Sequence, residues 1–320
     1  MNNIANVPVT LAKGLECEGD DVEVITLRLI GSQQPTWVKV LLLPWRWQEI
    51  IELNRRIIAG AFDVVHLHYA YLGWAGFQGD YDYFLHCHGT DVRFGLYDLV
   101  RRSVTVRSIC QAKRVFYSTP DLKEHVTAVR SDAVWLPNPV DTEQFCPLPR
   151  AEEGRRRVLF ISAMSRVKGV DKAFELIDLL RLEAPDVELA VFGFGDRLRR
   201  YARWPGVTVL PPVPHADMPE VINGFDVVVG QLHLGILSMS ELEAMSCGKP
   251  VVGQFHYPEC YEEQPPMLTG ETPEEWAAGI LRLLDSGEER AALGERARRW
   301  VVKHHDYRRV AHVLREFYLA

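Results

Sequence analysis

The residues best suited to chemistry in the first half of the chain are two pairs of histidines, His66 with His68 and His86 with His88. A histidine ring titrates near neutral pH, so it can exchange protons, and in its neutral form it can bind a metal ion. Side chains alternate along a strand, so each pair should face one side of its strand, with Cys87 on the other side. No carboxylate joins the four histidines at a tight spacing, and the sequence therefore predicts no metal site.

Asp91 follows His88 within residues 86–91 (HCHGTD). A carboxylate this close along the chain can orient the His88 ring or a bound substrate. We interpret His88 and Asp91 as candidate catalytic residues. The alternative is a hydrogen-bonded histidine with a purely structural role.

The second half of the chain carries the parts of an anion site. Ser238 stands before an expected helix, whose free N–H groups and positive dipole end attract a phosphate. It could cap that helix or donate to a phosphate oxygen. Gly235 lets the backbone approach a ligand closely. Lys168 would neutralise a diphosphate, with Arg166 as a second cation. The alternatives are a helix that is simply capped and exposed cations that bind no ligand.

Two glutamates lie on the same expected helix. Glu243 falls within residues 242–252 (LEAMSCGKPVV), and its carboxylate can accept two hydrogen bonds from a pair of hydroxyls. The alternative for Glu243 is a solvated side chain that pairs with a lysine. Glu241 lies about 200° around the helix from Glu243, so the two cannot share a face. We expect Glu241 to be structural or solvent-facing.

Alternating apolar runs and helical periodicities position these residues. Strands are expected at 21–27, 64–67, 83–87, 114–117, 157–161, 187–192, 207–210, 226–230 and 249–253. Helices are expected at 4–18, 47–60, 95–112, 120–129, 172–183, 238–247, 273–285, 287–302 and 306–318. A proline-rich stretch at 136–149 suits a linker. The pattern predicts an α/β protein of two doubly wound domains, 1–150 and 151–320, with a ligand in the crevice between them.

The expected first domain departs from the doubly wound pattern at its start. Such a domain usually opens with a strand that leads into the first helix, whereas this chain begins in that helix. A central strand that is lost leaves two unpaired edges. We therefore expect the native start to lie upstream of Met1. The alternative is a domain that naturally lacks its first strand.

Composition limits the classes of function. With 320 residues, of which 47% are hydrophobic and 25% charged, two soluble domains are expected. The net charge of -7 argues against a nucleic-acid partner. The six cysteines show no metal-binding spacing. No leader or spanning segment is evident, so a cytoplasmic protein is expected. Residues 37–47 (WVKVLLLPWRW) could touch the inner face of a membrane, although a buried strand is the preferred interpretation.

Six runs in this order resemble the GT-B glycosyltransferases of family 4 (glycosyl transferases group 1), and together they cover nearly the whole chain. They are DVVHLH at 63–68, HCHGTD at 86–91, LPNPVD at 136–141, KGVD at 168–171, GFG at 193–195 and LEAMSCGKPVV at 242–252. Pro139 stands where the family usually has glycine. Each run is weakly specific alone, and their order and spacing make the match specific.

The resemblance implies a GT-B fold of two Rossmann-like domains that face each other across a cleft. Residues 1–150 would bind the acceptor, a sugar, lipid-linked or small molecule, through His68 and Tyr69. Residues 151–320 would bind a UDP- or GDP-linked nucleotide sugar as co-substrate, and the last helix would return to the first domain. The nucleotide-sugar ligands implied are Lys168, Arg166, Gly195, Gly235, Ser238 and Glu243.

The resemblance further implies that Glu243 holds the ribose diol and that His88 faces the donor sugar. Transfer would retain the anomeric configuration and need neither a cofactor nor a divalent metal. A role in polysaccharide biosynthesis is expected.

Two positions depart from the family pattern. Ala163 stands where an arginine is usual, and Gly235 stands where the first of two glutamates eight residues apart is usual. That glutamate is implied to contact the donor sugar, so the identity of the sugar stays open. The departures leave two rival functions: a non-catalytic GT-B protein that binds a glycan or a partner, and a sugar-nucleotide epimerase, which would need further acid and base carboxylates.

Overall fold

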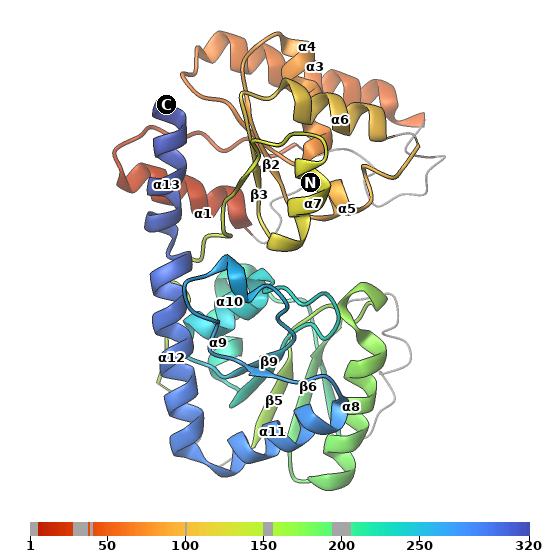
Figure 1. Ribbon diagram of the computed structural model, residues 1–320, viewed down its shortest axis with the longest axis vertical. Coiled ribbons are helices and arrows are strands. Elements are labelled where there is room, and N and C mark those ends of the chain that lie inside the picture. Colours follow the sequence, from red (N-terminus) through yellow and green to blue (C-terminus); the bar gives the residue numbers. More distant parts are fainter. Residues whose placement is uncertain (1–5, 28–37, 39–40, 100, 150–155, 194–205) are drawn as a thin grey trace. The chain divides into compact units, whose positions relative to one another are not determined.

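The computed structural model describes residues 6–27, 38, 41–99, 101–149, 156–193 and 206–320 (Figure 1). They form two compact units. The first unit combines Met1–Asn138 with Arg308–Ala320, and the second is Pro139–Tyr307. The chain thus passes between the units at Asn138–Pro139 rather than at residue 150.

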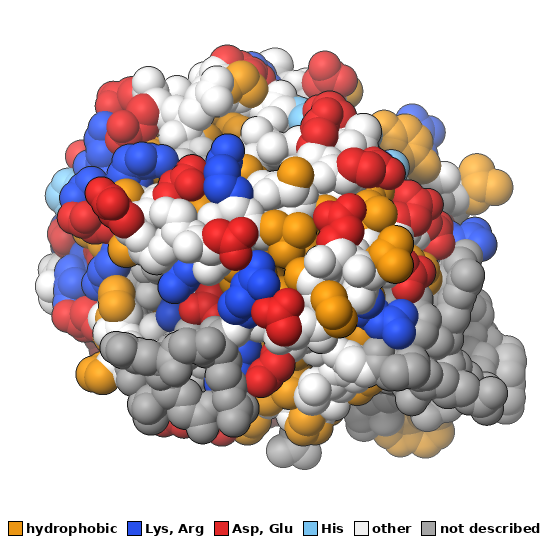
Figure 2. All heavy atoms as spheres, turned by 90° about the horizontal axis from the view of Figure 1, so that it is seen from below, with side chains coloured by type: hydrophobic (Ala, Val, Ile, Leu, Met, Phe, Trp, Pro, Cys, Tyr) orange, Lys and Arg blue, Asp and Glu red, His pale blue; other side chains and the backbone are white. Residues whose placement is uncertain are grey.

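The surface carries charges of both signs. Figure 2 shows basic and acidic side chains lying beside one another over one face of the molecule. Among the described residues, no helix combines the length and the apolar composition needed to cross a membrane.

In its described residues, the second unit is built on six parallel strands in the order β10-β9-β8-β5-β6-β7. They are β5 (Arg157–Phe160), β6 (Glu188–Phe192), β7 (Val207–Leu210), β8 (Val227–Val229), β9 (Val251–Gly253) and β10 (Leu268–Thr269). The all-valine β8 is fully buried, as expected for a strand covered on both faces. The order reverses between β5 and β8, which is the switch point of a doubly wound sheet.

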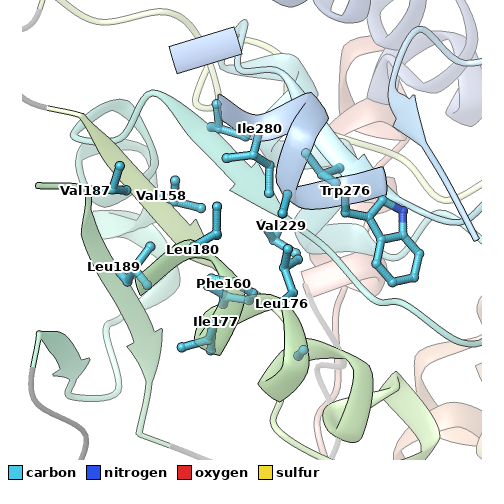
Figure 3. Packing of buried hydrophobic residues seen from close by; sticks show 14 of the residues in the cluster. Val158, Phe160, Leu176, Ile177, Leu180, Val187, Leu189, Val229, Trp276 and Ile280 are labelled. Carbon is cyan, nitrogen blue, oxygen red and sulfur yellow. The ribbon is translucent and has the colours of Figure 1, made fainter. Parts of the chain in front are cut away.

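Helices cover this sheet. Val158 and Phe160 of β5 pack with Leu176 of α8 (Val170–Glu183) and with Trp276 and Ile280 of α11 (Pro273–Asp285), as Figure 3 shows. The helix α10 (Met239–Ser246) packs against β8, β9, α9 (Met218–Asn223) and α12 (Gly287–His305). Buried apolar surface of this kind, at roughly 25 cal/mol per Å², holds the edge of the sheet and its loops in place.

The described part of the first unit has four parallel strands in chain order, β1 (His66–His68), β2 (Phe84–Cys87), β3 (Arg114–Tyr117) and β4 (Val134–Trp135). Its helices are α1 (Val7–Cys17), α3 (Leu43–Gly60), α4 (Trp74–Gly79), α5 (Thr90–Arg93), α6 (Arg102–Gln111), α7 (Lys123–Thr127) and α13 (Tyr307–Leu319). Leu85 and Val115 face a core that includes Ile109 of α6. Phe116 lies on the alternate face, where its ring meets Phe317 of α13.

The strand expected at 21–27 is wrong, because this segment forms neither helix nor strand. A parallel strand needs the backbone of a neighbour to complete its hydrogen bonds. Among the described residues, no strand pairs with this segment. Ile25 and Leu27 instead pack against the core formed with Ile50 and Ile57 of α3.

The buried strand expected within 37–47 is also wrong for its described part. Helix α3 begins there at Leu43, with Pro44 in its first turn, where a missing N–H costs no hydrogen bond. Trp45 and Trp47 are 54% and 43% exposed. Their exposure on a helix excludes the buried strand that was expected here.

Candidate functional site

The candidate site of the second unit lies where the loops after β5 and β8 meet. Ligands of doubly wound sheets bind beyond the carboxyl ends of the strands at the switch point. The loop after β5 carries Lys168 and the loop after β8 carries Gly235. The Leu232 N–H donates to the Lys168 carbonyl oxygen over 3.0 Å, which ties the two loops together.

Close packing at this junction requires glycine at 169. Gly169 has a φ of +81°, and a Cβ there would lie 2.9 Å from the Leu232 carbonyl carbon. Lys168 lines a small pocket together with Ser162 and Ala163. The Ser162 hydroxyl is buried without a hydrogen-bond partner among the described residues. The pocket thus offers a cation and a free hydroxyl, as an anion site would.

The start of α10 is held by a capping box between Ser238 and Glu241. Glu241 Oε2 accepts from the Ser238 N–H and hydroxyl, each over 2.7 Å, and Oε1 accepts from the Gln231 N–H over 3.1 Å. Burial raises the pKa of the Glu241 carboxyl, while these bonds and Lys168 oppose the rise. Glu241 is fully buried and structural, so the solvent-facing alternative is wrong. The Ser238 hydroxyl hydrogen is engaged by Glu241.

Glu243, one turn into α10, is only 4% exposed and pairs with a residue that the sequence did not single out. Its Oε1 lies 2.7 Å from His215 Nε2, and the His215 ring packs against Phe145. Burial raises the pKa of Glu243, and the His215 hydrogen bond opposes the rise. The bond to Glu243 raises the pKa of His215. No donor other than His215, among the described residues, reaches the Glu243 carboxylate.

Gly235 adopts a left-handed conformation, with φ +63°. A Cβ at this position would lie 2.2 Å from the ring nitrogen Nδ1 of His256. The backbone N–H of His256 donates to the Gly235 carbonyl oxygen over 2.9 Å. The ring of His256 therefore occupies the space that a side chain at 235 would need. Sequence reasoning missed His256; its position shortly after β9, at the same edge of the sheet, was the available signal.

The candidate residues of the first unit meet at the ends of β1 and β2. His68 Nδ1 lies 2.8 Å from His88 Nε2. The ring of Tyr69 packs against His88 with centroids 5.3 Å apart. Tyr69 is buried with a φ of +80°, and no described residue hydrogen-bonds its hydroxyl. Side chains other than glycine adopt this conformation rarely, and such strain concentrates at functional sites.

Asp91 holds the loop that carries His88. Its carboxylate accepts from the backbone N–H groups of Ala70 over 2.9 Å, Gly89 over 2.7 Å and His88 over 3.1 Å. Burial raises the pKa of Asp91, and these hydrogen bonds oppose the rise. Asp91 thus positions the backbone of His88 and does not bond its ring.

The structure brings the predicted residues together in two groups. Lys168, Gly235, Ser238 and Glu243 belong to one edge of the second unit, and His68, Tyr69, His88 and Asp91 to one edge of the first. Arg166 is exposed and forms no ion pair with any residue in the described ranges. Gly195 lies outside the described residues.

Two family descriptions match the chain. Residues 4–144 match Glycosyltransferase Family 4, and residues 155–286 match Glycosyl transferases group 1. D-inositol 3-phosphate glycosyltransferase of Pseudarthrobacter chlorophenolicus is 26% identical over 294 residues, which are 78% of this chain and 69% of the relative. Spore coat protein SA of Bacillus subtilis is 29% identical over 184 residues, 52% of this chain. The chain spans about half of that relative, 49%.

Solved structures share the fold. Sucrose-phosphate synthase from Thermosynechococcus elongatus superimposes with a TM-score of 0.71 at 18% identity, over 98% of this chain and 92% of that one. The HepE protein of Anabaena, in complex with UDP and glucose, superimposes with a TM-score of 0.71 at 17% identity, over 99% of this chain and 95% of that one. At these identities the likeness establishes the fold, two parallel α/β sheets of the GT-B type.

Proposed function

This chain belongs to the GT-B glycosyltransferases of the group 1 and family 4 type, and from that premise we propose that it transfers a sugar from a UDP- or GDP-linked donor to an acceptor hydroxyl. The observation that carries the proposal is the joined pair of loops at the β5/β8 switch point. They bring Lys168 and the start of α10 to the place where such sheets bind nucleotides. HepE, solved in complex with UDP and glucose, supports UDP as the first nucleotide to test.

In the proposed reaction the acceptor oxygen forms a bond to the anomeric carbon of the sugar. The bond from that carbon to the diphosphate oxygen breaks, and the products are the glycosylated acceptor, the nucleoside diphosphate and a proton. Lys168 and the free N–H groups of α10 stabilise the charge that grows on the diphosphate. These charges serve in place of a divalent metal at the diphosphate, and the anomeric configuration is retained.

Glu243 and His88 complete the proposal. Glu243 accepts hydrogen bonds from the ribose diol, since its carboxylate has only one donor among the described residues. His88 faces the sugar, and His68 and Tyr69 line the acceptor site. Burial holds the pKa of His88 well below its ordinary value, so its ring is neutral and can hydrogen-bond a hydroxyl.

A donor screen tests the proposal. UDP- and GDP-linked hexoses are incubated with the chain, with and without a chelator, and release of nucleoside diphosphate is measured. Lys168→Ala should lower the release rate by about 10²–10³-fold, the usual loss when one donor to a developing charge is removed. The matched control, Lys123→Ala on the exposed side of α7, should leave the rate unchanged. No release with any donor, or equal rates for both variants, would refute the proposal.

The rival functions predict other outcomes of the same screen. A non-catalytic binding protein would bind a glycan or a partner and release no nucleotide. An epimerase would convert the sugar without an acceptor, and it needs free acid and base carboxylates. The candidate carboxylates are all hydrogen-bonded: Glu241 in a capping box, Glu243 to His215 and Asp91 to backbone N–H groups. This arrangement favours transfer over epimerisation.

Exposed apolar side chains along and just before α3 support a further part of the proposal, a peripheral membrane contact that delivers a lipid-linked acceptor. Leu41, just before the helix, is 63% exposed, and along α3 Trp45 and Ile58 are 54% and 61% exposed. Tryptophan and basic residues suit a membrane interface. Sedimentation with anionic vesicles should capture the chain, and Trp45→Ser should reduce capture. The contact would be refuted if the vesicles removed neither the unchanged chain nor Trp45→Ser from the supernatant, so that both stayed at the level measured without vesicles. Cytoplasmic location and polysaccharide biosynthesis stay predictions.

A further inference from the structure

Four imidazoles are stacked on one face of the first sheet. The register of β1 and β2 places His68 beside His86, and alternation puts His66 and His88 on the same face. Ring centroids lie 4.7 Å apart for His66 and His68, 5.4 Å for His68 and His86, and 4.4 Å for His86 and His88. No carboxylate joins these histidines at a tight, metal-binding spacing in the sequence; the fold instead collects the imidazoles themselves.

Several nitrogens of this stack lack partners. His86 is fully buried, and neither of its ring nitrogens has a hydrogen-bond partner among the described residues. The same holds for His66 Nε2. A neutral imidazole carries one donor and one acceptor, and leaving them unpaired inside a protein is unfavourable. Such a group needs an explanation, and an absent ligand is one.

The partnered nitrogens follow the pattern of metal-binding histidines. His66 Nδ1 lies 2.5 Å from the hydroxyl of Tyr318 on α13, and His68 Nδ1 lies 2.8 Å from His88 Nε2. A metal ligand usually hydrogen-bonds through its other nitrogen, which fixes the orientation and tautomer of the ring. In both histidines this leaves Nε2 available. One ring nitrogen from each of His66, His68 and His86 lies within 4.8 Å of the other two.

We propose that His66, His68 and His86 bind one divalent transition-metal ion, for which Zn²⁺ is the probe. Three imidazoles with no thiolate and no carboxylate form a donor set that suits zinc, with Zn–N bonds of about 2.0–2.1 Å and an open fourth position. The rings must rotate out of their stacked orientation to converge on such an ion. The ion would join β1 to β2 and, through Tyr318, hold α13 on the sheet.

The charge state of the stack supports this assignment. Burial holds the pKa of His86 and His66 well below the ordinary value and lowers that of His68 to about 3. The three rings are therefore neutral at pH 7. Neutral imidazole is the form that binds metal, so no proton has to leave before an ion enters.

The experiment measures zinc binding by the full chain, made without a histidine tag and stripped with a chelator. Zn²⁺ is titrated in competition with a chromophoric chelator, and bound metal is counted by mass spectrometry. One ion per chain is expected. His86→Phe keeps an aromatic ring beside Phe116 and should weaken binding by about 100-fold or more, because losing even an outer partner costs about 10–100-fold. Tyr318→Phe should weaken it by about 10-fold.

Controls separate this site from adventitious zinc and from misfolding. His125→Phe, which removes a histidine paired with Tyr97 elsewhere in the first unit, should bind zinc like the unchanged chain. His66→Gln serves as a second ligand variant if His86→Phe fails to fold. An unchanged chain that binds no zinc, or binds it no more tightly than a folded ligand variant, would overturn the assignment. Nucleotide binding is measured separately, so the proposed transferase function stands or falls independently.

Discussion

Replacement of Glu243 by alanine gives the sharpest test of the proposed nucleotide site. The carboxylate is 4% exposed, and His215 is its single hydrogen-bond donor among the described residues. A ribose hydroxyl that donates to it would form a hydrogen bond to a charged group in a largely dry setting. Such bonds are worth about 1.5–3 kcal/mol, because the carboxylate is shielded from competing water.

The expected loss of affinity follows from that energy. At 1.4 kcal/mol per factor of ten, Glu243→Ala should weaken binding of UDP or GDP by about 10- to 150-fold. The 2′-deoxy nucleotides lack one hydroxyl of the diol. They should bind about 10-fold more weakly than the ribonucleotides to the unchanged chain, and equally to the variant, because the acceptor of that hydrogen bond is then gone.

Isothermal titration of the four nucleotides into both proteins measures these ratios. Glu220→Ala, which removes an exposed glutamate from the neighbouring helix α9, is the matched control and should bind like the unchanged chain. Thermal unfolding confirms that the variants are folded. Two results would refute the reasoning: affinity of Glu243→Ala within about threefold of the unchanged chain, or an unaltered preference for the ribonucleotide.

Three further outcomes are expected. The bond to Glu243 raises the pKa of His215 above 6.5, so the stability that the pair contributes is complete below about pH 6.5 and is lost as pH rises through the raised value. Urea unfolding between pH 6 and 9 should show this loss, and His215→Gln should remove it. Asp91→Asn would turn an amide donor toward three backbone N–H groups and should cost about 1–3 kcal/mol of unfolding free energy. Gly235→Glu should lower the free energy of unfolding by about 1–2 kcal/mol because its backbone is left-handed, and by a further amount because it displaces the His256 ring. Adding His256→Ala should recover only the loss caused by the displaced ring, as measured by calorimetry.

Much of the fold could be predicted because its signals are local. β3, β7 and α11 begin and end where the apolar periodicities predict. The two-residue strands β4 and β10 were missed, since so short a run carries no periodicity. Residues 21–27 alternate as a strand does but form no strand, because strand pairing depends on a neighbouring strand and not on the segment itself.

The candidate site likewise combines residues that the sequence could predict with partners that it could not. Glu243 and Lys168 could be proposed as candidates from runs of adjacent residues, because a helix start and a glycine turn are defined within a few positions. The partner of Glu243 could not, since His215 lies 28 residues away and reaches it only through the packing of separate elements. His256 meets Gly235 for the same reason.

The sequence by itself determined the alternation of strands and helices, the two α/β halves and the residue types at each strand end, because these depend on contacts between near neighbours. The tertiary structure decided which of those residues meet. The parallel register of β1 and β2 turned four scattered histidines into one stack, and the capping box turned Glu241 inward while Glu243 met His215. Register and crossover geometry bring residues distant in sequence within bonding distance, and no local pattern encodes them.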